Sequence, residues 1–297
     1  MKARLFAMAA ALAACAALAQ DYSKVEIKAT QLAPTTWMLT GAGGNMGLSA
    51  GDDATFLVDD QFAPLTERIT AAIAKIAAHP VKFVVNTHWH FDHTGGNENL
   101  ARQGVVIVAH DNVYKRMSTD QLIDFLKMKE AAAPHVALPV VTFGDALAFH
   151  LNGDDIQVMH VAPAHTDGDS IVVFAKSNVI HMGDTYFSGM YPFVDTSSGG
   201  RIDGMVAACD RVLAIAGDDT KIIPGHGPLS SKAELRAWRD MLAAISARIH
   251  RMVADGRNVD EIVAANPTAE FDSRYGNGFV KGPRFAEMIA LNVLKNP

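Results

Sequence analysis

Residues 86–96 read NTHWHFDHTGG and concentrate side chains that bind metal ions. Three histidines and an aspartate fall within six positions after the apolar run VKFVV, and they are His88, His90, Asp92 and His93. Alternate side chains on an extended backbone point to the same side, so the first two histidines can reach one ion together. After the chain turns, the aspartate and the third histidine can face a second point nearby. The glycines that follow permit a sharp turn into a helix.

Imidazole and carboxylate donors together predict zinc, which accepts nitrogen and oxygen ligands in a roughly tetrahedral shell. The alternative is a cluster of core or helix-capping histidines, which is disfavoured because burying several unpaired polar rings is costly. Four donors cannot complete two sites, so further ligands are required. Three later segments, VAPAHTDGDS, VIHMGDTYF and KIIPGHGPLS, each pass from apolar to polar residues, and they supply His165, Asp184 and His226. The other seven of the twelve histidines receive no metal role.

Apolar runs and turn residues predict the elements that must position these side chains. Expected strands cover residues 24–30, 36–40, 54–60, 81–85, 105–110, 149–153, 156–161, 170–175, 179–184 and 220–225. Expected helices cover residues 64–78, 97–103, about 111–131, 203–217, 230–255 and 283–294. Strands and helices are interleaved in both halves of the chain, which indicates an α/β fold with helices covering the sheets.

The first 19 residues are typical of a secretory signal peptide, with a basic start, an apolar stretch and a small-residue ending. We expect cleavage after Ala19, a single domain over residues 20–297, and a periplasmic or secreted protein without stable membrane insertion. The alternative is a lipid anchor at Cys15. Cys209 would then be the only cysteine of a released chain, and we expect it to be a buried apolar residue rather than a reactive thiol. The formal charge of −6 offers no basic surface for nucleic acid.

The ordered set of motifs, from GAGGN through GHG, resembles the metallo-β-lactamase superfamily of metal-dependent hydrolases. The resemblance implies an αββα four-layer sandwich of two mixed sheets flanked by helices. It implies two zinc ions per chain, the first bound by His88, His90 and His165 and the second by Asp92, His93 and His226. Asp184 matches the carboxylate that bridges the metals in glyoxalase II-like members. Asp59, which ends ATFLVD, matches an acidic residue that holds the loop by hydrogen bonding without binding metal.

The implied reaction is hydrolysis of a small-molecule substrate, in which two zinc ions lower the pKa of a shared water from about 15.7 to near 7 for attack on a carbonyl carbon. Asp92 and Asp184 would be the catalytic residues that orient the water or accept its proton. Export favours a β-lactam-like or other cyclic amide or ester substrate. Asp184 stands where true metallo-β-lactamases usually carry Cys or Ser, however, and this pattern favours a thioester or lactone hydrolase of glyoxalase II type as the alternative.

Two loops are expected to determine substrate specificity. The glycine-rich loop 41–47 could lie over the metals, so that Asn45 or Met46 contacts substrate. The segment 186–200 supplies an apolar wall, and its rings are Phe187, Tyr191 and Phe193. For each ring, packing within the loop alone is the equally weighted alternative.

Two other classes of function are compatible with parts of this pattern. An iron-dependent oxidoreductase of persulfide dioxygenase type uses a similar scaffold with a single iron, but the complete second ligand set argues for two metals. A purely structural zinc protein would keep the ligands without needing open coordination positions.

Overall fold

The computed structural model describes residues 21–295. The expected signal peptide, with Cys15, lies outside the described residues. Within that range, no helix combines the length and the apolar character needed to cross a membrane.

The first sheet has seven strands in the order β1-β2-β3-β4-β5-β6-β9. Their bounds are β1 (Lys28–Ala33), β2 (Thr36–Thr40), β3 (Met46–Ala50), β4 (Thr55–Val58), β5 (Val81–Asn86), β6 (Val106–His110) and β9 (Val141–Phe143). Strands β1 to β4 pair antiparallel, whereas β4, β5, β6 and β9 run parallel. The sheet is therefore mixed, and the carboxyl ends of its parallel strands share one edge.

The second sheet has six strands in sequence order, from β10 to β15. Their bounds are β10 (Ala146–Leu151), β11 (Asp154–His160), β12 (Ser170–Phe174), β13 (Val179–His181), β14 (Lys221–Ile223) and β15 (Ser230–Ser231). All neighbours pair antiparallel except β13 and β14, which are parallel because the chain crosses over between them through a long helix.

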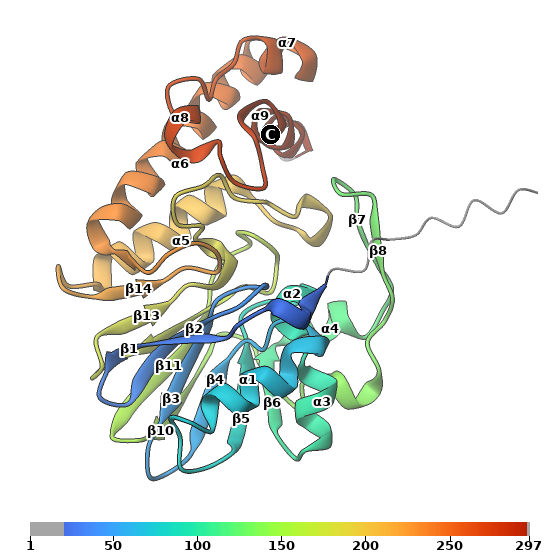
Figure 1. The fold of residues 1–297 in the computed structure, drawn as a ribbon. Coiled ribbons are helices and arrows are strands. Elements are labelled where there is room, and N and C mark those ends of the chain that lie inside the picture. The colour runs from blue at the N-terminus through green and yellow to red at the C-terminus, as the bar shows by residue number, and fades with distance from the viewer. Residues whose placement is uncertain (1–20, 296–297) are drawn as a thin grey trace, which may run out of the picture.

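Nine α-helices lie within the described range, and the longer ones cover the outer faces of the two sheets (Figure 1). Their bounds are α1 (Thr66–Ile73), α2 (Phe91–Thr94), α3 (Asn97–Arg102), α4 (Asp111–Met117), α5 (Ile202–Ile215), α6 (Lys232–Ala254), α7 (Val259–Ala264), α8 (Asp272–Tyr275) and α9 (Gly282–Lys295). Helices α1 and α3 pack on the first sheet, and α5 packs on the second with α6 and α9 stacked beyond it (Figure 1).

Three separate hydrophobic clusters correspond to the three interfaces of a four-layer fold. One lies between the two sheets and includes Phe56 and Phe174, whose ring centroids are 6.2 Å apart. The second joins the first sheet to α1 and α3, and the third joins the second sheet to α5, α6 and α9. The αββα sandwich of two mixed sheets flanked by helices is therefore confirmed.

The expectation of helix over residues 111–131 is wrong for its second half. Helix α4 ends at Met117, and the chain then forms the hairpin of β7 (Gln121–Ile123) and β8 (Met128–Glu130). Ile123 is buried in the cluster around α5 and α6, and the backbone N–H of Ala132 donates to the Asp120 carboxylate. These tertiary contacts override the helix-forming tendency of LIDFLKMKE.

Trp238 of α6 joins the outer helices to the loop that carries Asp184. Its side chain is 1% exposed, its indole N–H donates to the Met190 carbonyl at 2.8 Å, and its ring packs edge-on against Tyr186. We expect Trp238→Ala to lower the free energy of unfolding by about 3–5 kcal/mol, because it removes a large buried side chain and leaves a cavity. Denaturant titration measures this effect. Ile215→Ala, at a side chain that is 52% exposed, is the control and should change it by less than about 0.5 kcal/mol.

Candidate metal centre

The predicted ligands lie in loops and short helices that follow strands at the same end of the two sheets, and Asp92 and His93 lie in α2. Residues 87–90 follow β5, His165 lies in the loop between β11 and β12, Asp184 follows β13, and His226 follows β14. In parallel neighbours the carboxyl ends meet at one edge, which brings together side chains that are far apart in sequence. All seven predicted ligands converge there.

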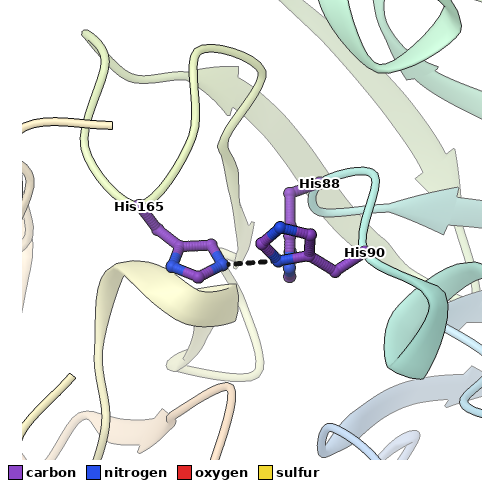
Figure 2. Close-up of side chains that lie close together, drawn as sticks. All are labelled: His88, His90 and His165. Atoms are coloured by element: carbon purple, nitrogen blue, oxygen red, sulfur yellow. Dashed lines mark hydrogen bonds between the residues drawn. The ribbon is translucent and has the colours of Figure 1, made fainter. Parts of the chain in front are cut away.

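The ligand atoms form three overlapping groups, in each of which the atoms lie within 4.8 Å of one another. The groups are His88 with His90 and His165, His88 with His93 and Asp184, and Asp92 with His93 and His226. Figure 2 shows the first group, with the His165 ring turned toward the rings of His88 and His90 across a short gap. Because neighbouring groups share His88 or His93, the arrangement is two adjacent sites joined by a middle group.

Asp184 lies between the two sites. Its Oδ1 is 3.1 Å from His93 Nε2, and its Oδ2 is 3.5 Å from His165 Nε2 and 3.4 Å from His226 Nε2. One carboxylate therefore faces histidines that belong to both sites.

Asp59 fixes two of the histidines from behind through hydrogen bonds. His93 Nδ1 donates to Asp59 Oδ2 at 2.8 Å, and the same carboxylate accepts from the Thr87 backbone N–H and hydroxyl. Since the Thr87 hydroxyl proton is used in this way, His88 Nδ1 must donate to the Thr87 oxygen, which lies 3.0 Å away. Both rings are therefore held with Nδ1 turned outward and Nε2 facing the site.

Asp195 orients His90 in the same way, and the sequence did not reveal it. His90 Nε2 donates to Asp195 Oδ2 at 3.1 Å, while the hydroxyls of Ser197 and Ser198 donate to the two oxygens of the same carboxylate. Asp195 is 1% exposed, and although burial opposes ionisation, the hydrogen bonds and the His90 ring hold its pKa well below the usual range. His165 Nδ1 donates to the Phe193 carbonyl at 2.8 Å, which frees its Nε2.

These outer hydrogen bonds turn ring nitrogens toward one another inside the cluster. His165 Nε2 lies 2.8 Å from His90 Nδ1, and His93 Nε2 lies 3.3 Å from His226 Nε2. The buried atoms His88 Nε2 and Asp184 Oδ1 have no hydrogen-bond partner among the described residues. A cation would stabilise the facing ring nitrogens and the buried atoms without a partner, so this nitrogen-rich donor set fits metal ions such as zinc.

The electrostatics divide the cluster into a neutral and a charged half. Burial lowers the pKa of His165 to about 4, so this ring stays neutral. On the other side, burial is outweighed by Asp184 and Asp92, which raise the pKa of His226 to about 9. Burial alone would raise the pKa of Asp92, but the neighbouring His93 and His226 lower it to about 2. The second group therefore holds ionised carboxylates that face imidazole rings with raised affinity for a proton, a position that a metal cation can also occupy.

The cluster opens to solvent at the second group. The side chains of Asp92 and His226 are 22% and 27% exposed, whereas those of His88, His90 and His165 are exposed by 5% or less. Substrate and water therefore reach the site from the side of Asp92 and His226.

The glycine-rich loop packs against the ligands, but its two predicted substrate contacts are not at the surface of the site. A Cβ on Gly44 would lie 2.0 Å from the His93 ring, so glycine is required for this close approach. Asn45 is buried, and its side-chain amide donates to the carbonyls of Pro224 and Gly227. Met46 is fully buried in the core of the first sheet. Both residues therefore support the structure, and Asn45 holds the His226 loop.

The predicted aromatic wall is divided between two roles. The Phe187 ring stacks on His226 at 5.3 Å, and the Phe193 ring lies 5.8 Å from His165 and 6.1 Å from His90. Tyr191 instead is 1% exposed, stacks on Phe285 of α9 and donates to the Asp272 carboxylate. Tyr191 therefore fixes the C-terminal helices, because its ring and hydroxyl are both engaged away from the metal ligands.

Zinc is expected to stabilise the folded protein strongly. A ligand that binds only the folded state adds about 4 kcal/mol at a thousand times its Kd. At about 2–4 °C per kcal/mol for a domain of this size, the melting temperature should rise by roughly 8–16 °C. Calorimetry of chelator-treated protein with and without zinc measures this shift. Magnesium is the control and should have little effect, because it prefers oxygen ligands in octahedral geometry.

Comparisons with known proteins agree with this geometry. The family model for the metallo-beta-lactamase superfamily matches residues 39–245. The alpha subunit of 2,4-dinitroanisole O-demethylase from a Nocardioides species is 23% identical over 87% of this chain and 75% of its own length. A probable hydroxyacylglutathione hydrolase from Schizosaccharomyces pombe is 26% identical over 67% of this chain and 70% of its own.

Solved structures share the fold. A metallo-beta-lactamase from Pontibacter korlensis is 20% identical, covers 73% of this chain and 99% of its own, and has a TM-score of 0.62. The sec-alkylsulfatase Pisa1 from a Pseudomonas species is 16% identical, covers 91% of this chain and 51% of its own, and has a TM-score of 0.71. The family model covers well over half of the sequence, and the predicted histidines and aspartates converge. The chain therefore belongs to the metallo-beta-lactamase superfamily, whose members are hydrolases that generally depend on metal ions.

Proposed function

We propose that this protein is a binuclear zinc hydrolase that cleaves a small carbonyl substrate, with a β-lactam-like or other cyclic amide or ester as the leading class. The observation that carries the proposal is the sharing of His88 and His93 between neighbouring donor groups, with Asp184 facing both. A structural zinc site would need only one closed group of four ligands. Two adjacent groups that open to solvent at Asp92 and His226 are what a hydrolytic site requires.

Zinc bound in these groups would supply an activated water and polarise the substrate carbonyl. Asp92 is the carboxylate best placed to accept a proton from the attacking water. Its side chain is 22% exposed, and its Oδ2 lies 3.2 Å from His226 Nε2. Asp184 is buried and holds the centre together through both of its oxygens. The rings of Phe187 and Phe193 limit the access of bulk water beside the histidines.

Hydrolysis of a thioester or lactone is the second candidate, and the position of Asp184 favours it. An additional anion between the metals lowers the electrophilicity of the site, which suits substrates with a better leaving group than an amide. The similarity to a probable hydroxyacylglutathione hydrolase supports this candidate. An iron-dependent oxidoreductase with one metal is a weaker candidate, because the second donor group of Asp92, His93 and His226 would then have no function.

We also propose that the enzyme acts outside the cytoplasm. This rests on the sequence of residues 1–19, with lipid attachment at Cys15 as the alternative. Mass measurement of the protein from the periplasmic fraction distinguishes cleavage after Ala19 from lipid attachment.

Metal analysis followed by a substrate panel tests the proposal. We expect two zinc ions per chain and hydrolysis of at least one of three classes: chromogenic β-lactams, lactones and thioesters. Preferential turnover of thioesters or lactones would support the second candidate over the first. One equivalent of iron would contradict the binuclear zinc centre, and a zinc-loaded protein inactive on all three classes would contradict the hydrolase.

A further inference from the structure

The β7–β8 hairpin brings a side chain beside Phe193, the aromatic neighbour of His90 and His165, and this side chain is not part of any sequence motif described above. The hairpin stands clear of the two sheets and extends toward α9 (Figure 1). Its turn carries Phe125, which is half-buried, and Lys127, which has a positive φ of 54°.

The Phe125 ring extends the apolar surface that begins at the metal ligands. Its centroid lies 6.1 Å from that of Phe193, and the Phe193 ring in turn lies 5.8 Å from His165 and 6.1 Å from His90. Phe193 is 7% exposed, so Phe125 presents the more accessible face of the pair. A continuous row of aromatic rings therefore runs from the first donor group to the hairpin, where the Phe125 ring is the accessible one.

The position of Phe125 is fixed by contacts outside the hairpin. The Arg284 guanidinium of α9 lies 3.8 Å from the centre of the Phe125 ring, and its Nη2 donates to the Phe125 carbonyl at 2.9 Å. The backbone N–H of Asp124 donates to the Ser197 hydroxyl at 3.1 Å. A ring held in this way loses little conformational freedom when a ligand packs against it, which favours binding.

The two sides of the centre differ in polarity. Asp92 and His226 form the solvent-exposed side and carry the charge, whereas Phe193 and Phe125 form the side next to His90 and His165. A substrate whose carbonyl lies over the metals can therefore place a polar end toward Asp92 and an apolar group against the two rings.

We infer that Phe125 is a specificity-determining residue that selects substrates with an apolar, preferably aromatic, group attached to the scissile carbonyl. Arg284 is the residue that positions it. The inference rests on the proposed hydrolase function and defines the acyl part of its substrate.

The kinetic test compares matched phenylacetyl and acetyl derivatives of one leaving group. We expect Phe125→Ala to lower kcat/KM for the phenylacetyl substrate by roughly tenfold or more, mainly through KM, and to change the acetyl substrate by less than about twofold. Leu122→Ala is the matched control, since Leu122 lies in the same hairpin and is 46% exposed. It should leave both substrates unchanged.

A binding measurement separates this inference from the proposed reaction. Thiolates bind zinc without turnover, so the affinities of zinc-loaded protein for benzyl mercaptan and 2-mercaptoethanol report on the neighbouring surface alone. We expect the wild type to prefer the benzyl thiol by about tenfold and Phe125→Ala to lose that preference, with zinc content unchanged.

Phe125→Gln, which retains most of the side-chain volume, should give the same loss if the alanine variant fails to fold. Arg284→Gln should weaken the preference partially. An undiminished preference for the benzyl thiol in a folded, zinc-loaded Phe125 variant would overturn the inference. The thiol-binding measurement decides this inference even if no substrate is hydrolysed. Inactivity on every substrate would instead contradict the proposed hydrolase.

Discussion

Replacing Asp184 with asparagine is expected to lower kcat/KM by roughly 10²–10⁴-fold, the size of effect typical of losing a charged group from a catalytic centre. The carboxylate lies 3.1–3.5 Å from ring nitrogens of three histidines that belong to different donor groups. An amide keeps the shape but removes the negative charge that two adjacent cations require. We therefore expect the variant to bind less than two equivalents of zinc, and steady-state kinetics with metal quantification measures both effects.

Asp218→Asn is a suitable control for Asp184→Asn, because Asp218 is fully exposed and only approaches Lys232 at 3.7 Å. It should leave activity and zinc content unchanged. If Asp184→Asn retained two zinc ions and full activity, the bridging role of this carboxylate would be wrong.

Replacing Asp195 with asparagine is expected to weaken zinc binding at the first donor group by about 10–100-fold, the usual effect of removing a carboxylate behind a ligating histidine. Asp195 accepts from His90 Nε2 and fixes the tautomer in which Nδ1 faces the cluster. An asparagine can present its N–H to His90 and so favour the wrong tautomer. Competition with a chromophoric chelator should show one of the two zinc ions bound more weakly.

The chain offers a matched control for Asp195→Asn at its surface. His150 Nδ1 donates to Asp155 Oδ1 at 2.7 Å, but the His150 side chain is 76% exposed and distant in sequence from the ligands. Asp155→Asn should therefore leave both zinc affinities unchanged. Equal weakening of both zinc ions by Asp195→Asn would point to general destabilisation rather than to His90.

The convergence of the seven predicted ligands could be anticipated because a donor-rich stretch followed a buried strand and three later segments supplied further donors. Asp195 was not predictable, since it lies 105 positions from His90 and is brought there by the fold of residues 195–199. Its only local signal is the sequence DTSSG, in which an aspartate side chain commonly accepts hydrogen bonds from the residues that follow it.

The main error in the predicted elements arose from residues 118–131. Leucine, methionine, lysine and glutamate are good helix formers, and their spacing in this segment is compatible with a helix. The segment forms a hairpin because Ile123 enters the core and Phe125 packs against Phe193, which are contacts between distant parts of the chain.

The error at Met46 and Tyr191 has a related cause. Sequence places both residues in loops near the site, but the side to which each side chain points depends on how the strands and the C-terminal helices pack. The local sequence pattern therefore predicted which segments lie near the site, but it did not predict the direction in which their side chains point.

The convergence of donors from both sheets has a consequence for how the protein acquires its metal. The first donor group needs the loop after β5 and the loop between β11 and β12, so neither half of the chain can form it alone. A metal ion bound by these residues would therefore be captured late, after the two halves have docked. If the chain is exported unfolded, the concentration of that ion in the compartment where it folds, rather than that in the cytosol, would set how much metal-loaded protein is produced.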